Sequence, residues 1–113
     1  MAPLLAVALS GVAFAEQHIQ DVLQHADDAV LSAGDAKSIG AHALDAIDVI
    51  DEAKAANASR ADVLEYLERG EEELHSAVTN ANRFNTNTAW QDALDAKRYL
   101  DAADQAANGQ APR

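Results

Sequence analysis

The stretch EQHIQDVLQHADDAVLSA, residues 16–33, decides the fold of this chain. Its apolar residues recur at spacings of three and four, which is the period of one face of an α-helix. These residues are Ile19, Val22, Leu23, Ala26, Ala29 and Val30. Gly34 follows directly and can end the helix, because glycine readily adopts the left-handed conformation found at helix C-termini. The stretch therefore predicts an amphipathic helix whose apolar stripe must pack against other helices.

The second and third predicted helices show the same pattern. Asp35 is the expected N-cap of a second helix, and that helix is expected to end at Asn57. Ser59, followed three residues later by Asp62, is the expected start of the third helix in a relaxed capping-box pattern. Gly70 lies within this third helix, where glycine is a weak helix former. Its presence predicts either close packing against a neighbour or a bend.

An asparagine-rich segment, residues 82–87, predicts the last loop. Asn87 or Thr88 is the expected N-cap of a fourth helix. The loop carries Phe84, and Trp90 follows shortly after it. We expect both aromatic side chains to close the end of the core. The alternative interpretation is that this loop is a tip that binds a partner.

Four amphipathic helices joined by short loops predict an all-α fold, an up-down-up-down antiparallel four-helix bundle. Alanine is abundant, and the only prolines, Pro3 and Pro112, lie at the two ends of the chain, so nothing interrupts the helices between them. A chain of 113 residues fits a single domain. We expect the bundle to occupy residues 16–107 and a disordered tail to occupy residues 108–113.

Residues 1–15 differ from the rest of the chain. They carry no charged side chain and end in Ala13-Phe14-Ala15, a small-x-small pattern that a signal peptidase accepts before Glu16. This segment predicts a signal peptide and a periplasmic or secreted mature protein, with a buried N-terminal helix as the alternative. It is short for a membrane span, so no stable membrane insertion is expected after cleavage.

The charge of the chain restricts its partners. Lys and Arg number 8 against 19 Asp and Glu, which gives a net charge of −11. Such acidity opposes binding to nucleic acid or to an anionic membrane and favours cationic partners, including metal ions. The chain has no cysteine, and its only methionine is Met1, so thiolate and thioether ligands and thiol catalysis are excluded. No serine nucleophile arrangement and no phosphate loop occurs in the sequence, so we expect no enzyme active site.

A short motif recurs along the predicted helices. His25-Ala26-Asp27-Asp28-Ala29 parallels His42-Ala43-Leu44-Asp45-Ala46, and Asp92-Ala93-Leu94-Asp95-Ala96 repeats the pattern with aspartate in the histidine position. This repeat indicates a duplicated helical hairpin.

Three histidines lie beside the apolar stripes of the first two helices, and each has an aspartate within about one helical turn. A nitrogen and an oxygen ligand together suit Zn(II), Ni(II) or Cu(II). The expected ligands on these helix flanks are His18, Asp21, His25, Asp28, His42 and Asp45. The alternative is that these residues are ordinary solvated surface pairs.

A second kind of site depends on signal cleavage. If cleavage follows Ala15, the mature chain begins Glu16-Gln17-His18. A free amine, two deprotonated backbone amides and the imidazole of the third residue can form a square-planar set of four nitrogens, which suits Cu(II) and Ni(II).

The repeated His-Ala-x-Asp-Ala pattern in alanine-rich helices after a signal peptide resembles the small metal-binding proteins of the bacterial periplasm, over about residues 16–105. The resemblance implies a four-helix bundle that binds copper, nickel or zinc through many histidines, without catalysis, and buffers or scavenges these metals. The family's histidine positions carry over to His18, His25 and His42. His75 fits the pattern poorly, and Asp92 replaces a histidine, so the chain is poor in histidine for such a family.

Two hypotheses follow. The first is a periplasmic protein that binds divalent copper, nickel or zinc without catalysing a reaction. The alternative is an exported helical interaction or structural module without metal, which forms a homodimer or binds a protein partner.

Overall fold

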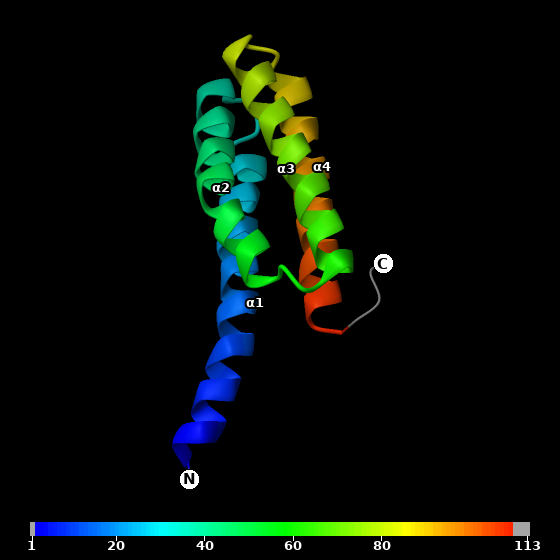
Figure 1. Ribbon diagram of the computed structural model, residues 1–113. Helices are drawn as coiled ribbons and strands as arrows, with labels where there is room; N and C mark the ends of the chain where they lie inside the picture. Colours follow the sequence, from blue (N-terminus) through cyan, green and yellow to red (C-terminus); the bar gives the residue numbers. More distant parts are fainter. Residues whose placement is uncertain (1, 110–113) are drawn as a thin grey trace.

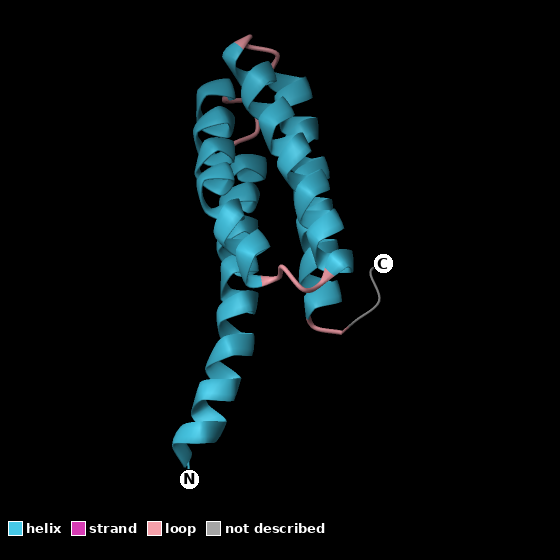
Figure 2. Cartoon of the chain, viewed as in Figure 1, coloured by secondary structure: helices cyan, strands magenta, loops and turns pink. Residues whose placement is uncertain are grey.

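A computed structural model describes the backbone of residues 2–109 and the side chains of residues 17–109. This part of the chain contains helices and no strand (Figure 2). The helices are α1 (Ala2–Leu31), α2 (Ala36–Ala56), α3 (Ala61–Asn82) and α4 (Thr86–Ala107). Consecutive helices run in opposite directions, and the α1–α2 and α3–α4 turns lie at the same end of the bundle (Figure 1). The predicted up-down-up-down four-helix bundle is confirmed.

The core consists of a few large aliphatic side chains and many alanines. The largest fully buried side chains are Ile19, Val22, Ile39, Ile50, Val63, Leu67, Leu74 and Leu100. Small residues allow the helices to approach closely at two glycines. A Cβ atom on Gly70 would lie 3.0 Å from Leu100 Cδ2, and one on Gly40 would lie 3.0 Å from Ala81 Cβ. Of the two interpretations of Gly70, close packing is therefore the one the structure supports.

The ends of α2 lie where the sequence placed them. Asp35 is the N-cap, and its Oδ1 atom accepts a hydrogen bond of 3.1 Å from the Ser38 backbone nitrogen. Asn57 is the C-cap and is buried. Its side-chain Nδ2 donates to the Ala53 carbonyl oxygen at 2.8 Å, which satisfies one of the carbonyls left without an intrahelical partner.

Two predicted N-caps are wrong. Helix α3 begins one residue later than a Ser59 cap implies, and its N-cap is Arg60, which makes no side-chain capping bond. Instead, Arg60 Nη2 donates to the Ala106 carbonyl oxygen at 2.7 Å, so a contact with the end of α4 replaces local capping. Helix α4 has Asn85 as its N-cap rather than Asn87 or Thr88. The Asn-rich segment is shorter as a loop than predicted because α3 continues through Asn82.

The expectation that two aromatic residues close the core is correct for one of them. Trp90 is partly buried, packs on the core, and donates from Nε1 to the Val30 carbonyl oxygen at 2.8 Å. Phe84 is 80% exposed, so its predicted role in the core is wrong. The physical reason is its position: Phe84 lies in the α3–α4 turn with a φ of 58°, and its side chain is not among those that pack against the core.

Helix α1 continues on the N-terminal side beyond the other three helices (Figure 1). Its backbone is helical from Ala2, through the predicted cleavage site before Glu16. The side chains of residues 2–16 lie outside the described set, so the signal peptide stays a prediction. The predicted tail falls partly outside it as well, since the description ends at Gly109. None of the described helices is both long enough and apolar enough to span a membrane.

Candidate metal site

The candidate ligands lie along the line where α1 packs against α2. Two contacts fix how these antiparallel helices are aligned. Ser32 Oγ and Ser38 Oγ share a hydrogen bond of 2.9 Å beside the turn, and His18 Nδ1 lies 3.5 Å from Glu52 Oε2 further along. His18 is fourteen residues before Ser32, and Glu52 is fourteen residues after Ser38, so the alignment holds over the whole interval. We call these two facing stripes the α1–α2 seam. It consists of His18, Asp21, His25, Asp28 and Ser32 of α1 and of Ser38, His42, Asp45 and Glu52 of α2.

This alignment places the two His-Ala-x-Asp-Ala motifs opposite each other in reverse order. Four residues from the serine pair, Asp28 of α1 is level with His42 of α2. Seven residues from it, His25 of α1 is level with Asp45 of α2. Each histidine therefore stands at the level of the aspartate of the other repeat. The repeat found in the sequence thus produces a reciprocal His/Asp layer in the middle of the seam.

Both histidines of this layer carry a buried nitrogen atom without a partner. The Nδ1 atoms of His25 and His42 are buried and make no hydrogen bond. A buried polar atom without a partner costs free energy, so such atoms are rare and their presence points to a missing ligand. An imidazole nitrogen with a free lone pair is a ligand for divalent transition metals. The donor chemistry of the layer therefore fits a metal ion.

The candidate ligands of the seam are not arranged around a common position for a metal ion. Within residues 17–109, no group of three or more His, Asp or Glu side chains is arranged to hold a metal ion. Asp21 and Asp45 are exposed, whereas Asp28 is half-buried. Exposed side chains change rotamer within nanoseconds, so the carboxylate positions are not fixed by packing. The layer therefore offers two candidate nitrogen donors, and the described side chains around them form no complete metal site.

Glu52 is a seam residue that the sequence reasoning missed. It lies seven residues after Asp45, two turns along the same face of α2, and this spacing is the signal that could have revealed it. Its contact with His18 gives that histidine a carboxylate neighbour from α2 in place of one from α1. His75, by contrast, is exposed on α3 and belongs to no part of the seam.

The amino-terminal site, unlike the seam, depends on cleavage of the chain before Glu16. Glu16, Gln17 and His18 lie within helix α1 in the full chain, and the Glu16 side chain is outside the described set. A square-planar site needs deprotonated backbone amides and therefore a non-helical first turn. The first backbone N–H groups of any helix lack intrahelical acceptors, so a chain beginning at Glu16 would leave these amides available. The prediction remains conditional on cleavage.

The α3–α4 hairpin repeats the geometry of the seam with other residues. Ser76 Oγ donates to Asp92 Oδ2 at 2.8 Å, and three residues further on, Glu73 is level with Asp95. Burial raises the pKa of Glu73, and the nearby Asp92 and Asp95 carboxylates raise it further. This hairpin therefore carries acids and a serine at the levels where the first hairpin carries the His/Asp layer, and the imidazoles of the repeat belong to α1 and α2.

Comparison with known proteins identifies the family of this chain. The family model of the small metal-binding proteins matches residues 1–103. The chain therefore belongs to the small metal-binding protein family, and the predicted resemblance is confirmed. No curated protein and no solved structure matches the chain.

Proposed function

We propose that this protein binds divalent copper, nickel or zinc at the α1–α2 seam and holds these ions as cargo without catalysing a reaction. The observation that carries the proposal is the pair of buried, unpartnered Nδ1 atoms of His25 and His42 at neighbouring levels of the seam. Membership of a family named for metal binding supports it.

The choice of metals follows from the donor atoms. Imidazole nitrogen with carboxylate oxygen suits Zn(II), Cu(II) and Ni(II), whereas Cu(I) prefers sulfur, which the chain does not offer beyond Met1. His18, with Glu52 at 3.5 Å, provides a further nitrogen and oxygen pair at the far end of the seam. A net charge of −11 raises the local concentration of cations around every such site.

The location that suits this function is the periplasm. The apolar, uncharged segment ending in Ala13-Phe14-Ala15 would direct export. A structural metal ion is held by a closed set of about four ligands, whereas the seam offers few ligands and leaves them open. Such a site suits reversible buffering or scavenging of metal better than permanent binding of a structural ion. The alternative, a helical interaction module without metal, is supported by a separate surface described below.

The test is calorimetric titration of Cu(II), Ni(II) and Zn(II) into the full chain. In a chain of residues 1–113 that keeps the segment before Glu16, no free amine precedes Gln17 and His18, so the amino-terminal site cannot contribute and the seam is measured alone. The double variant His25→Gln with His42→Gln removes both nitrogens while keeping side chains of similar length. We expect its affinity to fall at least about tenfold, which is the lower end of the loss on removing a ligand-positioning group.

The matched control is His75→Gln, because His75 is exposed and lies off the seam. It should bind as the wild type does. Equal binding by the double variant and the wild type would remove the seam as the site. A wild-type chain that binds none of the three metals would leave the interaction module as the better hypothesis.

A further inference from the structure

Two basic side chains without partners lie at the loop end of the bundle. Among residues 17–109, the Lys and Arg residues that form ion pairs are Lys54, Arg60, Arg69, Lys97 and Arg98. Lys37 and Arg83 form none, and both are exposed. They are the two basic residues next to the α1–α2 and α3–α4 turns. In a chain with a net charge of −11, the only unpaired described Lys and Arg residues are thus gathered at one end.

Phe84 lies at the same end of the bundle, in a backbone conformation that is unfavourable for phenylalanine and therefore lowers the stability of the fold. The Phe84 nitrogen donates to the Ala81 carbonyl oxygen at 3.0 Å, and the Asn85 nitrogen donates to the Asn80 carbonyl oxygen at 2.9 Å. This pair of bonds is the Schellman motif, whose left-handed position is normally glycine. The other positive-φ residues described, Gly34 and Gly109, follow that preference.

A phenylalanine in this position is unfavourable because its Cβ crowds the neighbouring carbonyl, which costs about 1–2 kcal/mol. The side chain recovers none of this through the core, since it is 80% exposed. Leu31, at the end of α1, is a second large apolar side chain that is 75% exposed. Strain and exposure together indicate that Phe84 serves contact with something outside the bundle.

These residues form one surface. The bond from Trp90 Nε1 to the Val30 carbonyl oxygen joins the start of α4 to the end of α1. The close approach of Gly40 and Ala81 joins the start of α2 to the end of α3. We call the resulting surface the tip and define it by Leu31, Asp35, Lys37, Arg83 and Phe84. With one acid and two bases it carries a net charge of +1.

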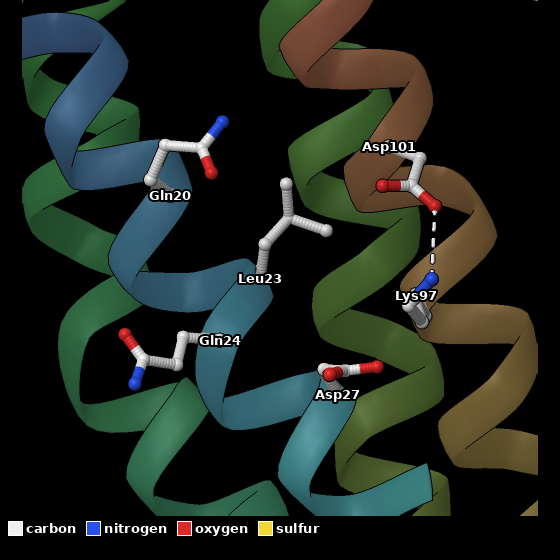
Figure 3. A pocket seen from close by; sticks show the side chains of 6 residues that line it. All are labelled: Gln20, Leu23, Gln24, Asp27, Lys97 and Asp101. Carbon is white, nitrogen blue, oxygen red and sulfur yellow. Dashed lines mark hydrogen bonds and ion pairs between the residues drawn. The ribbon is translucent and has the colours of Figure 1, made fainter.

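The flank of the bundle offers a complementary surface. A groove of about 400 Å³ between α1 and α4 is lined by Gln20, Leu23, Gln24, Asp27, Lys97 and Asp101. Leu23 projects from α1 toward the α4 side of this groove (Figure 3). Lys97 Nζ lies 3.5 Å from Asp101 Oδ2 and is thereby occupied, whereas Asp27 makes no ion pair. The groove therefore combines a leucine with an unpaired carboxylate, and its net charge is −1.

We propose that the tip of one molecule docks into the α1–α4 groove of a second copy of this chain, with Phe84 against Leu23 and Arg83 facing Asp27. The charges are opposite, and an aromatic side chain on a convex end matches an apolar residue in a concave flank. Tip and groove are different surfaces of the same chain, so the contact is head to side and each molecule can both give and receive one.

The first experiment is sedimentation velocity of the full chain over a concentration series, at about 0.15 M salt, where the Debye length of about 8 Å screens repulsion between the acidic bodies. The wild type should show a sedimentation coefficient that rises with concentration. Phe84→Asn removes the aromatic side chain, and asparagine tolerates the left-handed backbone, so this variant should fold normally. Its association constant should fall at least about tenfold. The wild type and Phe84→Asn share residues 1–16, so any association through that segment is the same in both and does not affect the comparison.

The sharper experiment mixes two defective chains. Phe84→Asn has an intact groove but no functional tip, and Asp27→Lys has an intact tip but a repulsive groove. Each alone should associate at least about tenfold more weakly than the wild type, while their mixture should form one-to-one dimers that cannot grow further. Circular dichroism of both variants checks their helicity. Leu44→Asn, an exposed leucine outside both surfaces, should associate as the wild type does.

Three outcomes overturn the proposal: a wild type that remains monomeric throughout, a Phe84→Asn chain that associates equally well, or a mixture that forms no dimer. A monomeric wild type that instead sediments with anionic phosphatidylserine vesicles through Phe84 makes the tip a membrane contact. The metal titration is independent of all these results, because His25 and His42 belong to neither surface.

Discussion

The indole nitrogen of Trp90 donates a hydrogen bond of 2.8 Å to the carbonyl oxygen of Val30, sixty residues earlier in the chain. Val30 is one of the last four residues of α1, whose carbonyls have no acceptor role within the helix. Trp90 of α4 thereby satisfies the end of α1 and ties the two hairpins together. At the opposite end of the bundle, Arg60 does the same for the Ala106 carbonyl oxygen.

Replacing Trp90 with Phe should therefore destabilise the bundle by about 1–3 kcal/mol, because a partly buried carbonyl loses its donor. Chemical denaturation followed by circular dichroism measures the change. Tyr66→Phe is a suitable control, since Tyr66 is half-buried and its hydroxyl makes no hydrogen bond within the described residues 17–109. Equal stability of Trp90→Phe and the wild type would show that water replaces the indole at no cost.

Phe84→Gly should stabilise the chain by about 1 kcal/mol, because glycine adopts the left-handed conformation without strain. Gly34→Ala should have the opposite effect, since Gly34 has a φ of 88°. Thermal unfolding of the two variants beside the wild type measures both changes. A loss of stability in Phe84→Gly would mean that the exposed ring contributes to the folded state after all.

Glu73→Gln should raise the melting temperature at neutral pH by an amount on the order of one or two degrees. Folding raises the pKa of Glu73 above its ordinary value of 4.5, chiefly by burial, so the folded state binds this proton more tightly than the unfolded chain does. The ionised carboxylate therefore opposes folding above its folded pKa, and this penalty vanishes as the pH falls below 4.5.

The gain from Glu73→Gln should accordingly disappear in acid. Glu72→Gln is the matched control, because Glu72 is the exposed neighbour on α3 and its removal changes the net charge equally. Melting temperatures measured across the acid range separate the two. Parallel profiles for both variants would show that net charge, rather than the setting of Glu73 beside Asp92 and Asp95, controls the effect.

In a chain that begins at Glu16, His18 faces two alternatives. It can remain on the seam beside Glu52, or it can fold back onto the free amine as the first helical turn unwinds. We expect one equivalent of Cu(II) that acetylation of the amine abolishes, while Cu(II) bound at the seam by His25 and His42 survives acetylation, and a visible absorption band typical of nitrogen ligands checks the geometry. Identical Cu(II) binding by the acetylated chain would place His18 on the seam.

The helices could be predicted from the sequence because the period of the apolar residues is a local property. Asp35 and Asn57 mark the ends of α2 by bonds within a few residues, so local patterns located them. The start of α3 could not be found in this way, because the Arg60 side chain donates a hydrogen bond to the Ala106 carbonyl oxygen on α4, a contact between residues far apart in the sequence. The prediction that Phe84 packs in the core failed for a related reason. An aromatic residue normally predicts burial, and the sequence does not indicate that Phe84 adopts a left-handed backbone conformation in a turn.

For the candidate site, the sequence located the histidines and their repeat but not their alignment. The level of His25 beside Asp45 depends on how α1 and α2 pack, which the Ser32 and Ser38 contact reveals. The burial of the Nδ1 atoms is likewise a product of packing. Glu52 was missed because it belongs to no repeat.

The seam lies on helix flanks, outside the fully buried alanines and aliphatic residues that stabilise the bundle. Histidines can therefore be gained or lost there by single mutations without disturbing the fold. In the second hairpin, Glu73 and Asp92 occupy the levels that His25 and His42 occupy in the first. The number of ligands at the proposed metal site can thus change while the buried core that sets the architecture stays the same.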